Sequence, residues 1–339
     1  MISIDYKKGL PIDYESFLIE RYNSYFTTCR YMEVYYNSYD INYMLVYENG
    51  DLVELLVFGN LGNTSSCFNS LVDIDQRIID VCIQKIFETF PSIQKIEIVA
   101  LYKKYTLNKS FLFFKADDYV LNLPSTMDDY CLELGYHTRK NLKNRKARLS
   151  RDYSQANFII KFGEEIEEFL INKIIQLSHD RMKQKGVICN FDNAYNKHIF
   201  KYSQHYGCVA YLELDGAIVS GCISTIINRR LFLHVTAYDN NYSKYNVGEV
   251  CVFQLIESSI DKSISSVHFL WGETELKKRF LAKPQLLFSY YIYRHYSLDY
   301  VINGIKYLIL NMLNYFKDSK ISNPFRTLIK FFRRKNKKA

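Results

Sequence analysis

The sequence predicts a mixed α/β fold in which two similar α+β domains follow one another along the chain. Three observations lead to this prediction. The chain has 339 residues, and this length favours two domains. Hydrophobic residues make up 48% and charged residues 24%, the balance of a globular protein. Finally, segments with helical and with strand periodicity alternate in the same coarse order in both halves.

The first half, predicted as an α+β domain over 1–124, contains four periodic segments. They are a helix at 14–22, two strands within 43–59, a helix at 73–90 and a strand at 93–102. Asn49-Gly50 separates the two strands, and this dipeptide is the strongest short hairpin signal.

A helical linker is predicted at 125–157. Its section 139–151 holds seven Lys/Arg and no acid. Such a run is ordinarily a solvated helix face, and the alternative is a contact with an anionic acceptor or a cofactor phosphate.

The second half, predicted as a domain over 158–316, has predicted helices and strands in the same coarse order as the first. Its segments are a strand at 158–162, helices at 163–186 and 193–207, three antiparallel strands within 208–239, a helix at 247–264 and a strand at 266–272. Turns are predicted at Asp215-Gly216 and at Asn228-Arg229.

The excess positive charge lies at the C-terminal end. The chain has 44 Lys/Arg and 36 Asp/Glu; residues 317–339 hold nine of the basic and one of the acidic residues, which leaves 35 of each. A neutral body argues against a broad nucleic-acid-binding surface. The tail places apolar residues on one helical face, which predicts an amphipathic helix on an anionic membrane surface; a disordered, solvated tail is the alternative.

The cysteines and the N-terminus indicate a cytoplasmic protein. None of the eight Cys forms a CxxC pair or has a His at zinc-finger spacing, so we expect buried free thiols and no metal. Charged residues follow Met1 directly, and the chain has no run of 18 apolar residues, so neither a signal peptide nor a membrane span is predicted.

A strand, a loop and a helix in the second half have the order that an acyl-CoA site requires. The strand at 231–239 leads through a polar loop to Gly248 at a helix start. A helix N-terminus offers unpaired backbone N–H groups to a phosphate, and glycine allows close approach. Strands that splay apart leave backbone groups free to pair with pantetheine amides. Gly248 in a merely structural turn is the competing interpretation.

At these residues the chain resembles a known group. YDNNYSKYNVGEVCVFQLIE (238–257) and HFLWGETELKKRF (268–280) resemble the CelD-like, or FemAB-related, branch of the GNAT acyltransferases, and LSHDRMKQKG (177–186) resembles that branch's Leu-x-His-x-x-Arg helix. The likeness covers about 160 residues from Arg139 to Tyr296. It implies a GNAT-type fold, two such domains in tandem, and acetyl-CoA or another acyl-CoA as co-substrate.

Two departures weaken the match. Ser243 and Asn246 stand where the usual GNAT loop has a basic residue and its first glycine, which puts phosphate binding in doubt. Leu276 stands where the branch has a Tyr before its Lys, so a family hydroxyl is missing.

Three sets of site residues follow from these patterns. Glu273 or Asp239, at strand ends, is the predicted general base, and Tyr290 is the predicted proton donor to the departing thiolate. The predicted cofactor loop is Lys244, Tyr245, Asn246, Val247, Gly248 and Glu249. The predicted substrate contacts are His234, Trp271, Lys277 and Arg279. Each has an ordinary interpretation as well: solvated acids at strand ends, a core histidine and tryptophan, and a solvated basic helix.

The predicted function is transfer of an acyl group from acyl-CoA to an amine. The resemblance implies an acceptor in surface polysaccharide or envelope biosynthesis, such as a nucleotide- or lipid-linked amino sugar. One alternative is a Fem-like transferase that uses aminoacyl-tRNA, and this is the one setting in which nucleic-acid binding is expected. Another is a non-catalytic, membrane-associated GNAT-fold module. The expected location is the cytoplasm, at the inner face of the membrane if the tail docks there.

Overall fold

The computed structural model describes residues 2–186, 191, 193–272, 274–296 and 298–318. Within them, one sheet of twelve strands runs through the molecule in the order β1-β2-β3-β4-β5-β12-β6-β11-β10-β9-β8-β7. Each strand of the first half corresponds to the strand numbered six higher in the second half, so that β1 matches β7 and β6 matches β12. With this correspondence, the strand order is the same when it is read from either edge of the sheet. The sheet therefore has a pseudo-twofold arrangement, and the expected mixed α/β fold of two similar halves is confirmed.

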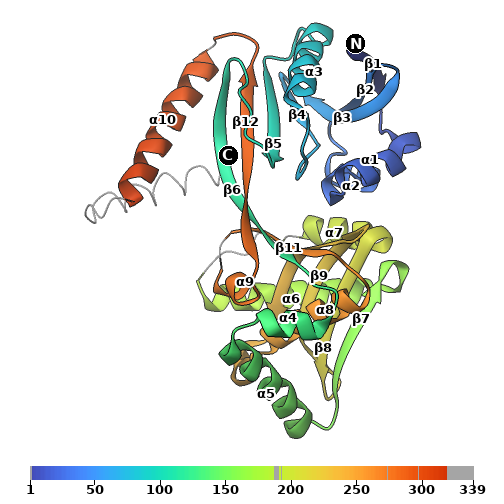
Figure 1. Cartoon of the computed structure of the whole chain (residues 1–339), viewed down its shortest axis with the longest axis vertical. Helices are drawn as coiled ribbons and strands as arrows, with labels where there is room; N and C mark the ends of the chain where they lie inside the picture. The colour runs from blue at the N-terminus through green and yellow to red at the C-terminus, as the bar shows by residue number, and fades with distance from the viewer. Residues whose placement is uncertain (1, 187–190, 192, 273, 297, 319–339) are drawn as a thin grey trace.

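The N-terminal half, β1 to β6, forms the upper lobe in Figure 1. Its elements are β1 (Ile2–Lys8), η1 (Ile12–Tyr14), α1 (Glu15–Tyr22), η2 (Tyr25–Thr27), α2 (Cys29–Tyr35), β2 (Asp40–Glu48), β3 (Asp51–Leu61), β4 (Thr64–Cys67), α3 (Gln76–Thr89), β5 (Lys95–Leu101) and β6 (Ser110–Asn122).

Most of the C-terminal half, β7 to β11, forms the lower lobe, whereas its last strand, β12, extends into the upper lobe. This half is reached through α4 (Met127–Glu133) and the basic helix α5 (Tyr136–Asp152). Its elements are β7 (Ala156–Phe162), η3 (Gly163–Glu165), α6 (Glu168–Gln184), α7 (Asn193–Tyr206), β8 (Gly207–Leu214), β9 (Ala217–Ile227), β10 (Arg230–Tyr238), η4 (Asn240–Tyr245), α8 (Val247–Asp261), β11 (Ser266–Trp271), α9 (Glu275–Arg279) and β12 (Lys283–Tyr293). The chain then continues in α10 (Leu298–Asp318).

The two halves exchange their last strands. β12 lies between β5 and β6 of the N-terminal half, and β6 lies between β11 and β12 of the C-terminal half. In Figure 1 these two long strands run together from one lobe to the other. The predicted domain boundaries at 124, 157 and 316 remain predictions, and the sheet is continuous across the first of them.

The predicted turns form for the expected reason. Asn49 and Gly50 have φ of 56° and 97° and join β2 to β3, and Asp215 and Gly216 have φ of 46° and 82° and join β8 to β9. Two successive residues with positive φ are the requirement of a tight hairpin that follows the strand twist. Asn228, with φ 50°, turns β9 into β10.

Helices cover both faces of the sheet in the C-terminal half. Ile171 and Ile174 of α6 pack with Ile223 on one face, whereas Cys251 and Leu255 of α8 share a core with residues of the opposite face. Alternate residues of one strand reach the two cores because successive side chains point to opposite faces. The helix α8 thereby starts at the same edge where β10 ends.

The described chain ends in the helix α10. None of the helices in the described ranges combines the length and apolar character that crossing a bilayer requires. The predicted amphipathic tail falls mostly on 319–339, which lie outside the described residues. Its contact with a membrane therefore stays a prediction.

Candidate functional site

The strands β10 and β11 diverge, and a cleft opens between them. They pair in parallel only from Arg230 to Phe232, opposite Ser266 to His268, although β10 continues to Tyr238. A cavity of about 650 Å³ lies where they separate, and we name it the C-terminal cleft. Leu233, His234, Thr236, Tyr238, Phe269 and Trp271 line it from the two strands. The edge of β10 that has left β11 can pair with an extended ligand.

The N-terminus of α8 faces this cleft. The preceding residue, Asn246, adopts a left-handed conformation with φ 51°, and its side chain makes no capping hydrogen bond. The first N–H groups of a helix lack intrahelical partners and favour an anion. Ser243, Asn246, Gly248 and Glu249 line the cleft around this point. A helix terminus with a free anion position thus lies at the mouth of a slot between strands.

The remaining residues of the predicted cofactor loop hold the turn in place. Tyr245 and Val247 are buried. The Tyr245 hydroxyl lies 3.0 Å from the Asp152 carboxylate at the end of α5, and the Lys244 ammonium lies 4.7 Å from the Tyr245 ring centroid. Of the six predicted residues, Asn246, Gly248 and Glu249 are therefore those that line the cleft.

Gly248 is required by a close neighbour within the protein. A Cβ atom built there would lie 2.5 Å from the Tyr238 ring, which is closer than side chains pack. The ring in turn lies 4.9 Å from the guanidinium of Arg181 on α6. Gly248 therefore lets α8, the end of β10 and α6 meet at the rim of the cleft.

Basic side chains dominate the cleft. Arg181, Lys185, Lys277 and Arg279 line it, together with Glu249 as the one acid among the described lining residues. The Glu249 carboxylate is 7% exposed and accepts from Arg145 of α5 and, at 2.8 Å, from Arg279 of α9. This pairing anchors the basic helix α5 on α8. The excess of cations favours an anionic ligand.

Arg181 is a site residue that sequence reasoning quoted within a motif but did not assign. Its Nε is buried and, among the described residues, has no hydrogen-bond partner. A buried, unpaired guanidinium atom is costly, and an anion in the cleft would satisfy it. The Leu-x-His-x-x-Arg likeness of 177–186 was the signal that could have identified it.

Lys277 stabilises the end of β11. Its ammonium donates to the carbonyls of Leu270, Trp271 and Gly272 at 3.0, 2.8 and 2.7 Å. Burial lowers the pKa of Lys277 to about 8. Leu270 has a positive φ of 55°, so these bonds fix a bent strand end. The Lys277 ammonium, which was predicted to contact the substrate, thus donates to backbone carbonyls.

His234 and Trp271 both line the cleft. The His234 Nε2 lies 2.8 Å from the Thr225 hydroxyl, and its ring packs edge-on against Tyr25 at 4.8 Å. Burial lowers the pKa of His234 to about 4, so the ring is neutral near pH 7. Trp271 remains 42% exposed at the opening.

Two of the predicted catalytic residues, Asp239 and Tyr290, lie in different parts of the molecule. Asp239 accepts from the Asn241 N–H at 2.9 Å, caps η4, and lines a neighbouring hollow of about 580 Å³. Tyr290 lies in the core of the N-terminal half, where its hydroxyl accepts from the Tyr105 N–H at 2.7 Å. Glu273 lies outside the described residues. The general base therefore stays a prediction. In the described ranges, no cluster of three or more His, Cys, Asp or Glu could hold a metal ion.

The corresponding place in the N-terminal half is closed. β4 pairs with β5 up to Cys67, but the chain beyond it pairs again: the Leu71 N–H donates to the Ala100 carbonyl at 2.8 Å and the Tyr102 N–H to the Val72 carbonyl at 3.1 Å. Asn69 holds this segment against β3, because its side chain accepts from the Val57 N–H and donates to the Leu55 carbonyl.

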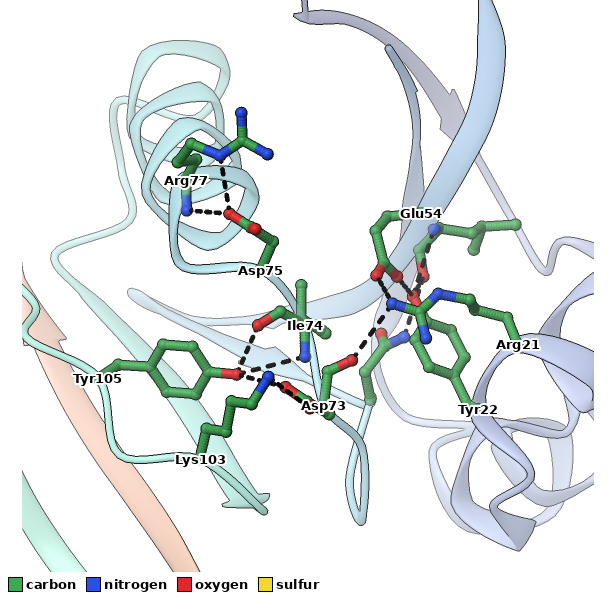
Figure 2. Close-up of polar contacts among 11 residues, drawn as sticks. Arg21, Tyr22, Glu54, Asp73, Ile74, Asp75, Arg77, Lys103 and Tyr105 are labelled. Carbon is green, nitrogen blue, oxygen red and sulfur yellow. Dashed lines mark hydrogen bonds and ion pairs between the residues drawn. The ribbon is translucent and has the colours of Figure 1, made fainter.

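The start of α3 is filled by the protein itself, as Figure 2 shows. Asp75 caps the helix by accepting from the Arg77 N–H at 2.8 Å, and the Arg77 side chain pairs with the same carboxylate. Lys103 pairs with Asp73 at 2.7 Å just before the cap. The N-terminal half thus supplies its own anion where α8 leaves the position free.

The comparisons with known proteins agree with this geometry. The family described as "Acetyltransferase (GNAT) domain" matches residues 137–278. FemX has a similar fold, with 9% identity over 88% of this chain and 100% of FemX, and a TM-score of 0.66. L-PGS from Bacillus licheniformis is 12% identical over 89% of this chain and 97% of that one, with a TM-score of 0.55.

A conserved protein of unknown function from Bacteroides thetaiotaomicron also has this fold, with 12% identity over 85% of this chain, 99% of that chain and a TM-score of 0.52. No curated protein matches the chain in sequence. At these identities the structural matches establish the fold, whereas the sequence match covers the segment that contains α8, β10 and β11. Residues 137–278 are therefore similar in sequence to the GNAT acetyltransferase domain.

Proposed function

We propose that the C-terminal cleft transfers an acyl group from acyl-CoA to an amine. The single observation that carries the proposal is the divergence of β10 from β11 directly beside an uncapped helix N-terminus. A pyrophosphate fits the N–H groups at the start of α8, and an extended pantetheine arm fits the free edge of β10. The basic lining of the cleft supports an anionic co-substrate.

The chemistry follows from this placement. The neutral amine nitrogen attacks the thioester carbonyl, the C–S bond breaks, and the CoA thiolate leaves while the amine loses a proton to a base. A backbone N–H of β10 beyond Phe232 is the proposed donor to the oxyanion. Holding both reactants in one slot lowers the entropic cost of the encounter. Glu273 remains the proposed base on the strength of its position in the sequence.

The acceptor is proposed at a coarser level. The likeness to the CelD-like and FemAB-related branch supports an amino sugar of the envelope or of a surface polysaccharide, carried on a nucleotide or a lipid. An amphipathic tail on the inner face of the membrane would suit a lipid-carried acceptor, and both statements await their own tests.

A second candidate donor is aminoacyl-tRNA, because α5 presents a basic face next to the cleft. Lys140, Lys143 and Lys146 are exposed on α5, while Arg145 of the same helix pairs with Glu249 at the start of α8. An exposed row of cations can follow a phosphate backbone. The two donors share the cleft but differ in their need for this row.

Titration calorimetry with CoA, acetyl-CoA and tRNA separates the candidates. Gly248→Val should abolish CoA binding, because the new side chain collides with the Tyr238 ring and shifts the start of α8. Gly135→Val is the matched control, since a Cβ at this exposed helix cap meets nothing within 4 Å.

A Lys140→Glu/Lys143→Glu double variant should leave CoA binding unchanged and would weaken only tRNA binding. Tight tRNA binding with none for CoA would replace the acyl-CoA proposal by the tRNA one. Binding of neither ligand by the folded wild-type protein would contradict both.

A further inference from the structure

A small cavity lined by aromatic side chains lies where the two halves meet. It has a volume of about 100 Å³, and its lining consists of Tyr25, Tyr31, Tyr35, Tyr195, Ile199, Tyr202 and His234. We name the five tyrosines and His234 the tyrosine cage. Its walls come from η2 and α2 of the N-terminal half and from α7 and β10 of the C-terminal half. In Figure 1, α2 of the upper lobe faces α7 of the lower lobe, and these two helices are in contact.

The rings of the cage contact one another both edge-on and in a stacked pair. Tyr31 stacks on Tyr35 with centroids 4.4 Å apart, and it meets Tyr25 and Tyr202 edge-on at 5.3 and 5.7 Å. Tyr25 in turn meets His234 edge-on at 4.8 Å. Rings placed at such angles present electron-rich faces as well as edges to the space between them, and electron-rich faces attract cations.

The polar groups of the cage also suit a cation. Tyr25 is 5% exposed, and in the part of the chain that the structure describes its hydroxyl has no hydrogen-bond partner. Burial raises the pKa of Tyr25 well above its ordinary value, so the hydroxyl stays neutral and offers its oxygen as an acceptor. No Lys, Arg, Asp or Glu is among the described lining residues. His234 is neutral near pH 7 because burial depresses its pKa.

The cage and the C-terminal cleft share one lining residue. His234 lines both cavities. Aromatic contacts continue toward the cleft opening, because Phe26 lies 4.1 Å from Tyr25 and 6.2 Å from Trp271. The two cavities are therefore adjacent, and an acceptor that occupied both would pass the His234 side chain.

We propose that the tyrosine cage binds a cationic ammonium group of the acyl acceptor, at a nitrogen other than the one that is acylated. The inference rests on the proposed function and narrows its acceptor to molecules with a second, cationic nitrogen. The bound nitrogen stays protonated or quaternary, so it cannot attack, while a separate neutral amine reaches the thioester. The cage exceeds the ~10–15 Å³ that one water needs and is far smaller than a site for a whole ligand of ~300–1,000 Å³, so it holds a head group.

The test uses choline and its neutral isostere 3,3-dimethylbutan-1-ol with the full chain. The two probes have the same shape and differ in charge, so calorimetry of both separates attraction for a cation from simple filling of an apolar space. Choline should bind about tenfold more tightly than the neutral alcohol. Equal affinity for the two probes, or no binding of choline by the folded protein, would overturn the proposal.

Variants locate the binding. Tyr35→Leu removes one ring of the stacked pair and should weaken choline binding about tenfold. Tyr25→Phe keeps the ring and removes the unpartnered hydroxyl, so a smaller loss is expected. Tyr39→Leu, a half-buried tyrosine of the same half outside the cage, is the control and should bind choline like the wild type.

Binding of CoA serves as the second measurement. The cage residues Tyr25 and Tyr35 lie outside the cleft lining, so both variants should bind CoA with unchanged affinity, which also shows that they are folded. Choline binding lost with CoA binding intact supports the cage. Choline binding that survives Tyr35→Leu would place the ammonium site elsewhere and contradict it, and failure of CoA to bind the wild type would contradict the proposed function alone.

Discussion

The two halves of this protein use the same arrangement of strands and differ at one junction. In the N-terminal half, the chain beyond β4 pairs again with the end of β5, and Asp75 fills the start of α3. In the C-terminal half, β10 leaves β11 after Phe232, and Asn246 provides no side-chain cap for α8. One half is thereby closed by its own backbone and carboxylate, and the other is open.

The two halves also differ two residues beyond the last pair of the parallel strands, which is Cys67 with Ile98 in the N-terminal half and Phe232 with His268 in the C-terminal half. There the N-terminal half has Asn69, which is buried and hydrogen-bonded to two backbone groups, and the C-terminal half has His234, which faces the cleft. Two places along the partner strand, Ala100 and Leu270 share a positive φ of 59° and 55°. Both halves thus have the same backbone bend at the end of the partner strand. The local side chains determine at which of the two bends a ligand site can form.

The largest effect is expected from the acid at the start of α8. Glu249→Gln removes a buried carboxylate from between Arg145 and Arg279 and should lower the free energy of unfolding by about 3 kcal/mol, because two guanidiniums lose their partner. Urea denaturation measures this loss. Affinity for CoA should be kept or increased by the freed cations.

The matched variant in the closed half is Glu54→Gln, which removes a buried carboxylate that accepts from Arg21 and Tyr22. It should reduce stability and leave CoA affinity unchanged. A change of CoA affinity on Glu54→Gln would undo the distinction between the halves.

A pH-dependent difference is expected next. The pKa of His234 is about 4 in the folded protein and near 6.5 when unfolded, so the unfolded state binds more protons between these values. The stability that His234 contributes is therefore full above pH 6.5 and is lost as the pH falls toward 4, by about 3 kcal/mol.

Replacement of His234 by the residue of the closed half tests this assignment. His234→Asn should lose less stability between pH 6.5 and 4 than the wild type, as measured by urea denaturation at several pH values. Parallel curves for the two proteins would show that His234 is not the titrating group.

An exchange of helix caps should have a moderate effect on ligand affinity. Asn246→Asp places a carboxylate at the anion position of α8 without a change in size, as Asp75 does in α3. We expect CoA affinity to fall about tenfold through repulsion of the phosphates. Calorimetry at low and high salt should show the difference shrinking as salt screens the charge.

The smallest effect is expected at the cap of α3. Asp75→Ala should cost about 1 kcal/mol of stability, the usual value of an N-cap, and should leave CoA affinity unchanged. Thermal melting with and without CoA measures both quantities. A loss of CoA affinity here would indicate a second site in the closed half.

The sequence predicted most of the fold because its signals were local. The helix at 76–89 and the turns at Asn49-Gly50 and Asp215-Gly216 depend on periodicity and on backbone conformation within a few residues. By contrast, the short strand β4 and the exchanged strand β6 were not predicted. β4 has four residues, and the place of β6 depends on partners from the far end of the chain.

The site was predicted in part for the same reason. Gly248 and Asn246 could be placed at a helix start from the sequence alone, and both line the cleft. Asp239 and Tyr290 were chosen because they end or occupy strands, but the direction of a side chain depends on packing that the pattern does not contain. The tyrosine cage could not be predicted from the sequence either, because Tyr25 and Tyr202 come together only through the contact between the two halves.

The exchange of β6 and β12 has a consequence for biosynthesis. Ile96 of β5 pairs with Ile292, 196 residues later in the chain, so at ~5–20 residues per second the ribosome needs roughly 10–40 s to deliver the partner. During this interval the nascent chain carries an exposed strand edge, which is a template for aggregation. High contact order also makes such pairing slow. The sheet of both halves is therefore completed only after β12 has been synthesised.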